Sequence, residues 1–248
     1  MRKTTVSGLM ASALLVISSP LLAGEFIVGG GAVSFKSPYK DFKDNSSAYL
    51  LAEYEGENFS VGSEGINYRL LGDDEGPFSL YATLDSVGMG FDSGDSTFFS
   101  GMAERDSSFD LGLSADYQLA DSVISASVLH DISGAHKGFT ADLSYSYLVP
   151  LGEHAMFVPM VGVNYLSEEF TDYYFGVRTR EATASRAAYK ADATANTYVG
   201  YSLDMPLNES WSINHSASYI WLGDEVTDSS LVDRDTSWFA SLGVAYRF

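Results

Sequence analysis

The chain has 248 residues, of which 33 are acidic and 14 are basic, and it contains no cysteine. The formal net charge of −19 argues against a nucleic-acid partner, and the lack of cysteine excludes disulfides and thiolate metal sites. Its 16 tyrosines, 15 phenylalanines and 23 glycines are compatible with a soluble β-sandwich or with a membrane β-barrel.

The first 23 residues predict a cleaved secretory signal peptide. Arg2 and Lys3 supply the positive start, and an apolar run broken only by small residues leads to Ala23. A membrane anchor would need about 20 apolar residues and no small-residue cleavage site. We therefore expect export through the Sec pathway, cleavage near Ala23 and one domain over residues 24–248.

The rest of the chain alternates with a period of two over stretches of about ten residues, which is the pattern of a membrane-spanning β-strand. In 109–119, for example, Phe109, Leu111 and Leu113 alternate with polar or small residues. Strands of sandwiches are nearer five or six residues long, so the length favours a barrel. Strands are expected at 26–35, 48–54, 78–89, 109–119, 123–130, 139–149, 156–166, 197–207, 211–222 and 238–248.

Between residues 58 and 71 the alternation slips at Gly62 to Gly65, so the segment is either one bulged strand or two short strands. A single bulged strand leaves an odd total, whereas a barrel with both ends in the periplasm needs an even one. We expect an all-β, antiparallel up-and-down transmembrane barrel of about 12 strands, within 10 to 14. The extra strand comes from a split at Gly62 to Gly65 or, more weakly, from Tyr173 to Val177.

Loop length predicts the orientation, because periplasmic turns of such barrels are short and external loops are long. Short connections at 119–122, 150–153 and 206–209 alternate with long ones near 91–107, 167–195 and 223–236. The short set is therefore expected on the periplasmic side.

Four aspartates fall on the polar phase of their strands and are expected to face the lumen: Asp110, Asp116, Asp142 and Asp204. Left unpaired, they would favour cations in a channel. Paired with Arg69, Arg105 or Arg247, they would form a packed ionic plug. We expect a largely filled lumen, because about 12 strands lie between side-chain-filled barrels of eight and open porins of 16 or more.

One segment departs from the acidic balance of the chain. Residues 178–190 carry Arg178, Arg180, Arg186 and Lys190 against the single acid Glu181. This external loop is expected to fold over the acidic lumen, to bind lipopolysaccharide phosphates through its arginines, or to remain a solvated loop. The sequence leaves the three open.

A hydrolase would need a nucleophile and a base, and His130, Asp131, Ser133 and His136 fall in one short external loop. Triads are recognised by geometry rather than by closeness in sequence, so we interpret these residues as polar loop residues. No catalytic, cofactor-binding or metal-binding residue is predicted.

The last strand ends on an alternating face formed by Leu242, Val244, Tyr246 and Phe248. This pattern resembles the C-terminal recognition signal of the barrel-assembly machinery, which is therefore an expected partner.

Several segments together resemble the MipA/OmpV outer-membrane family, the MltA-interacting protein family. They are residues 37–40, 51–59, 101–106, 131–138, 172–177 (Asp-Tyr-Tyr-Phe-Gly-Val) and 243–248. The resemblance implies an outer-membrane protein surrounded by lipids and lipopolysaccharide. In one member it implies a scaffold that bridges a lytic transglycosylase and a murein synthase. A non-enzymatic scaffold is thus expected first, a narrow cation-leaning channel second and an outer-membrane lipid hydrolase third.

Overall fold

A computed structural model of the chain describes residues 24–42, 46–63, 65–73, 76–87, 90–152 and 154–248. The expected signal peptide and the end of the expected strand 78–89 lie outside these residues. The strands are β1 Gly24–Lys36, β2 Ser46–Gly56, β3 Phe59–Gly62, β4 Gly65–Leu71, β5 Phe78–Val87, β6 Ser108–Leu119, β7 Ser122–Asp131, β8 Phe139–Tyr147, β9 Val149–Leu151, β10 Ala155–Leu166, β11 Thr194–Pro206, β12 Trp211–Trp221 and β13 Thr236–Arg247.

The strands close into one antiparallel barrel, because consecutive strands pair, apart from β8 and β9, and β13 pairs back with β1. β8 and β9 both pair with β10, so together they count as one strand of the barrel wall, which is interrupted at Leu148. The barrel wall therefore has 12 strands, and the expected fold and strand number are confirmed.

The phase slip is a turn between two short strands, β3 and β4, which pair with each other from Phe59 with Tyr68 to Gly62 with Gly65. The alternative strand at Tyr173 to Val177 is wrong, because this segment ends the helix α1, Glu168–Phe175. Ser167 caps α1 by accepting the N–H of Phe170, and the buried Phe170 and Tyr174 stand four residues apart on one helical face.

The strands of the β3–β4 hairpin are shorter than the neighbouring strands β2 and β5. β2 begins at Ser46, yet it pairs with β3 only at Tyr54 and Glu55. Within the described part of the chain, the outer half of β2 thus has a strand neighbour on the β1 side alone. The Glu53 carboxylate fixes the hairpin tip by accepting the N–H and the Oγ–H of Ser63, at 3.1 and 2.6 Å.

The alternation places apolar side chains outside the barrel and polar ones inside. In β6, Phe109, Leu111 and Leu113 are about half exposed, whereas Asp110 is fully buried. Such an apolar outer surface is the one that faces lipid in a transmembrane barrel.

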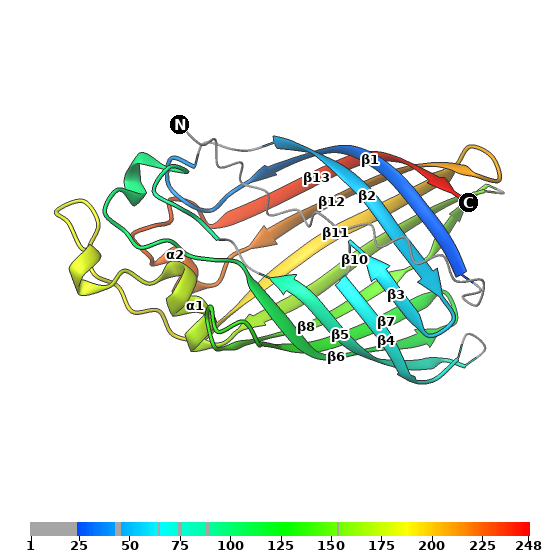
Figure 1. Cartoon of the computed structure of the whole chain (residues 1–248), viewed down its shortest axis with the longest axis horizontal. Coiled ribbons are helices and arrows are strands. Elements are labelled where there is room, and N and C mark those ends of the chain that lie inside the picture. The colour runs from blue at the N-terminus through cyan, green and yellow to red at the C-terminus, as the bar shows by residue number, and fades with distance from the viewer. Residues whose placement is uncertain (1–23, 43–45, 64, 74–75, 88–89, 153) are drawn as a thin grey trace.

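The two ends of the barrel differ, as Figure 1 shows: the long loops gather at one end, and the short turns and the C-terminus lie at the other. The loop end also carries α1, α2 (Asp224–Thr227) and the 3-10 turns at Thr97–Phe99 and Thr179–Glu181. None of the helices in the described ranges has the length and apolar character needed to cross a membrane.

Candidate functional site at the outer mouth

The principal apolar core lies at the loop end of the barrel. Eleven buried residues from four long loops and the strand ends beside them form what we term the loop plug: Tyr39, Phe91, Phe99, Leu166, Phe170, Tyr174, Phe175, Val177, Val226, Leu231 and Val232. The Tyr39 ring lies at 5.2 Å from Phe91, 5.4 Å from Phe99 and 5.5 Å from Phe175. Segments far apart in the sequence are thereby packed over the mouth.

The Tyr39 hydroxyl donates to the backbone oxygen of Tyr174 at 3.1 Å, and the Tyr174 hydroxyl donates to that of Asp106 at 2.9 Å. Burial raises the pKa of Tyr39 and of Tyr174, so both phenols keep the proton that these bonds require.

A buried ion pair fastens the 90–107 loop to the 178–190 loop. Arg105 donates to Glu181 at 3.0 Å and to the backbone oxygens of Tyr173 and Ala103 at 2.6 and 2.8 Å. Burial alone would raise the pKa of Glu181. The hydrogen bonds from Arg105 and from two backbone N–H groups outweigh burial and hold that pKa below its ordinary value.

The basic loop divides into inner and outer members. Arg186 is buried and donates to the backbone oxygens of Glu181, Ser100 and Phe98. It therefore binds the neighbouring loop segments and is not available to lipopolysaccharide. Arg178 and Arg180 are exposed. Lys190 is also exposed and pairs with Glu168 at 2.7 Å. The loop is therefore not solvated throughout.

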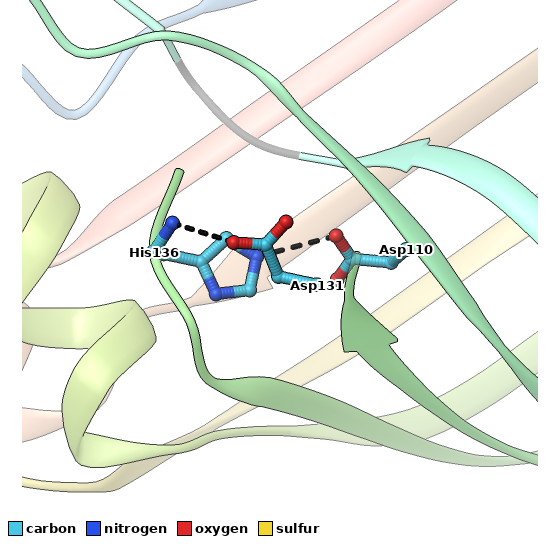
Figure 2. A group of neighbouring side chains, drawn as sticks. All are labelled: Asp110, Asp131 and His136. Carbon is cyan, nitrogen blue, oxygen red and sulfur yellow. Dashed lines mark hydrogen bonds and ion pairs between the residues drawn. The ribbon is translucent and has the colours of Figure 1, made fainter. Parts of the chain in front are cut away.

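Asp131 organises the turn between β7 and β8. Its carboxylate accepts the N–H and the Oγ–H of Ser133 and the backbone N–H groups of Gly134, His136 and Lys137, all at 2.7 to 3.0 Å. Figure 2 shows the bond from the His136 backbone and the His136 ring turned toward Asp110.

The His136 ring is buried and its proton is fixed by its neighbours. Nδ1 accepts the N–H of Gly138 at 3.1 Å, so the proton lies on Nε2, which reaches Ser108 Oγ at 3.1 Å and Asp110 Oδ1 at 3.3 Å. The other oxygen of Asp110, Oδ2, is buried and has no hydrogen-bond partner among the described residues.

Potential ligand atoms of Asp110, Asp131 and His136 lie within 4.8 Å of one another, but their bonding does not suit a metal ion. The His136 Nε2 atom carries a proton, and both Asp131 oxygens already accept hydrogen bonds. Nor is the geometry that of a Ser-His-Asp triad, which places Ser and Asp on opposite ring nitrogens, whereas Ser108 and Asp110 share Nε2.

The other residues of the suggested triad are also placed differently. Ser133 donates to Asp131 rather than to a histidine, and the exposed His130 lies against the backbone oxygen of Asp131 through Nδ1 at 2.9 Å. The group formed by Ser108, Asp110, Asp131 and His136 therefore serves to hold the β7–β8 turn in place.

The other three acids that we expected to face the lumen are half-buried and have neutral partners. Asp116 accepts from Ser125 at 2.6 Å, Asp142 accepts from Tyr198 at 2.9 Å, and Asp204 accepts from Asn214. Of the two alternatives for these acids, pairing with Arg105 or Arg247 is wrong, because Arg105 pairs with Glu181 and Arg247 pairs with Glu25 at 3.2 Å.

The C-terminal face lies on the barrel exterior. Leu242, Val244 and Phe248 are exposed, and the Tyr246 ring contacts the edge of Trp211 at 5.0 Å. The backbone N–H of Phe248 donates to the Phe26 oxygen at 2.9 Å, which joins the chain end to β1.

Comparisons with known proteins agree on one family. The family described as MltA-interacting protein MipA matches residues 28–248. The outer membrane proteins Omp26La of Vibrio anguillarum and OmpV of Vibrio cholerae are 35% and 34% identical, each over 91% of this chain and 87% of the relative. The MltA-interacting protein of Escherichia coli is 28% identical over 97% of this chain and 98% of its own.

Among solved structures, the anion-selective porin from Comamonas acidovorans aligns over 92% of this chain and 99% of its own, with 8% identity and a TM-score of 0.43. OmpT of Vibrio cholerae aligns over 92% and 97%, with 8% identity and a TM-score of 0.40.

Proposed function

The chain belongs to the MltA-interacting protein family, and from this membership we propose that it is a non-enzymatic scaffold of the cell envelope. It is an outer-membrane β-barrel, and in the proposed role its loop plug closes the outer mouth while its periplasmic rim binds partners.

The observation that carries the proposal is the loop plug. Four long loops bury a continuous aromatic core at the mouth, and the Arg105–Glu181 pair ties two of them together. Packing of this kind favours one fixed arrangement over an open pore, since it resembles the core of a folded domain. A closed barrel is suited to presenting surfaces rather than to conducting solutes.

The periplasmic end offers a mainly acidic surface for such partners. Exposed acids stand at the short turns and at the barrel edge: Glu55, Glu57, Asp73, Asp121 and Glu209. Arg247, a base at the same rim, is paired with Glu25. This charge favours partners with a basic face, because complementary potentials steer and orient association. The proposed partners are a murein-cleaving lytic transglycosylase and a murein synthase.

The experiment is affinity capture from envelope extracts with the full-length barrel. The wild type is expected to retain murein enzymes, and the double variant Glu57→Lys with Glu209→Lys is expected to lose them. A matched control reverses two outer acids, Glu169→Lys with Asp224→Lys, and should capture as the wild type does. Capture of no murein enzyme by the wild type would exclude the scaffold proposal.

A narrow, cation-leaning channel is the second candidate. It is favoured by the half-buried lumen aspartates Asp116, Asp142 and Asp204, which keep partial access to solvent. Planar-bilayer recording separates the two functions, since a plugged barrel gives no steady conductance and a channel gives cation-selective steps.

A further inference from the structure

A pocket opens beside the loop plug, between α1, the β7–β8 turn and the segment that joins α1 to β11. Its volume is about 670 Å³, which is the size of many small-molecule sites. Its charged lining residues are Lys137, Arg178, Lys190, Asp172 and Glu169, and Tyr173 and Tyr189 supply its aromatic rings. Its three cations thus outnumber its two carboxylates, although the formal net charge of the whole chain is −19.

Lys137 stands on the pocket wall in an unusual backbone conformation. Its φ angle is +61°, in the left-handed region that non-glycine residues adopt only at a steric cost. The Asp131 carboxylate holds this conformation by accepting the Lys137 N–H at 2.7 Å. The Lys137 side chain is exposed, and its ammonium has no carboxylate partner within the described ranges.

Arg178 presents a second cation that is only loosely paired. Its Nη1 atom lies 3.6 Å from Glu181, whose carboxylate already binds Arg105 and two backbone N–H groups. The Arg178 side chain is 46% exposed, so it remains accessible to a ligand from solvent. Lys190 differs, because its ammonium is engaged by Glu168 at 2.7 Å.

The tyrosines of the pocket are anchored through their hydroxyls, which leaves the rings as fixed walls. Tyr189 donates to Glu225 Oε2 at 2.9 Å, and the Tyr173 oxygen accepts the N–H of Asp106 at 2.9 Å. Asp172 lines the same pocket, and it accepts the N–H of Ala191 through Oδ1 at 3.1 Å. The lining therefore combines rigid aromatic rings, the two carboxylates of Asp172 and Glu169, and two available cations.

We propose that this pocket binds a phosphorylated saccharide. Lys137 and Arg178 hold the phosphate, for which a guanidinium and an ammonium are suited donors. The carboxylate of Asp172 accepts sugar hydroxyls, and the Tyr189 ring packs on the apolar face of the sugar, as aromatic rings with a fixed polar end do. The pocket faces outward, so the sugar phosphate comes from a lipopolysaccharide headgroup or from the medium. The assignment does not depend on the proposed scaffold function.

The test is calorimetric titration of the folded full-length protein in nanodiscs that contain phospholipid without lipopolysaccharide. Glucose 6-phosphate is expected to bind at least about tenfold more tightly than glucose or inorganic phosphate alone, because it uses both halves of the site. Lys137→Asn, which suits a positive φ, and Arg178→Gln should each weaken binding about fivefold or more. Arg180→Gln removes an equal charge from the same loop outside the pocket and should change binding less than about twofold.

Nanodiscs with lipopolysaccharide distinguish the two sources. Loss of glucose 6-phosphate binding there assigns the pocket to the lipid headgroup, and retained binding assigns it to soluble sugar phosphates. Either result supports the site. Three results would overturn the proposed site. They are an equal effect of Arg180→Gln and Arg178→Gln, binding of inorganic phosphate as tight as that of glucose 6-phosphate, and absence of binding in the lipopolysaccharide-free discs.

Discussion

The guanidinium of Arg105 lies 3.0 Å from the carboxylate of Glu181, 76 residues further along the chain, and the two side chains are 1% and 2% exposed. A charge that loses its partner in such surroundings stays buried without compensation. This pair therefore governs how firmly two external loops are held over the mouth.

Glu181→Ala should loosen the loop plug, because it leaves Arg105 buried and unpaired at a cost of about 3 to 5 kcal/mol. Limited trypsin digestion of the folded barrel should then cut quickly after Arg178 and Arg180, whose side chains are exposed but whose backbone the intact plug holds in place. Asp233→Ala, which removes the partner of the partly exposed Arg234, is the control and should cost no more than about 1 kcal/mol. Equal protection of Glu181→Ala and wild type would exclude this role.

The plug should also respond to acid through Glu181, whose pKa is held below its ordinary value of 4.5 by Arg105 and two backbone N–H groups, although burial opposes them. A lowered folded-state pKa contributes stability that is present above the ordinary value and is lost as the pH falls through the lowered one. Tryptic protection should therefore hold from pH 7 to about 5 after brief pre-incubation, and fall only below about 4. Glu181→Gln should lack this acid step, and an identical acid step in that variant would count against the assignment.

Lys137 offers a test of backbone strain at the pocket wall. Lys137→Gly should match or exceed the wild type in stability of the β7–β8 turn, because glycine adopts a positive φ without steric cost. Lys137→Val should destabilise the turn by more than about 1 kcal/mol, since a β-branched residue fits that region poorly. Amide hydrogen exchange over residues 131–138 measures both, and similar protection in the two variants would contradict the argument.

Arg186→Ser should affect the mouth more than either outer arginine of its loop. Arg186 donates to backbone oxygens of both the 90–107 loop and its own loop, whereas Arg180 is exposed. In planar bilayers, Arg186→Ser should raise conductance above that of the wild type, and Arg180→Ser should not. If the two variants behave alike, the loop acts through its overall charge rather than through this contact.

Deletion of Phe248 should leave export intact and reduce insertion into the outer membrane. The residue ends the alternating exterior face, and its N–H joins the chain end to Phe26 of β1. Fractionation and the gel mobility of unheated samples measure folded barrel in the outer membrane. Phe248→Tyr keeps an aromatic end and is the control. Wild-type levels of the deletion variant in the outer membrane would exclude the C-terminal recognition signal.

Most of the strands were predictable because they obey a local rule, the period of two over a stretch long enough to cross a bilayer. The split at Gly62 to Gly65 followed from the same rule. The loops were not predictable, because their contacts are non-local. Nothing near Arg186 in the sequence indicates that it bonds backbone oxygens of Phe98 and Ser100.

The error at Tyr173 to Val177 has a similar origin. Too short for a clear period, the segment takes its structure from the cap at Ser167 and from packing of Tyr174 in the plug. The pocket likewise joins segments about 40 residues apart. The sequence therefore showed its cations but did not indicate that they line one pocket.

The short β3–β4 hairpin gives the molecule a preferred side. A barrel with walls of equal height presents much the same surface to neighbours from every direction in the membrane plane. Here the wall is low beside β2, and over Ser46 to Glu53 the backbone has one strand neighbour within the described ranges. Backbone amides along that stretch should exchange with deuterium sooner than their counterparts in β12. The orientation of the barrel about its own axis thus determines whether an adjacent molecule in the membrane contacts this part of β2 or the full-height wall.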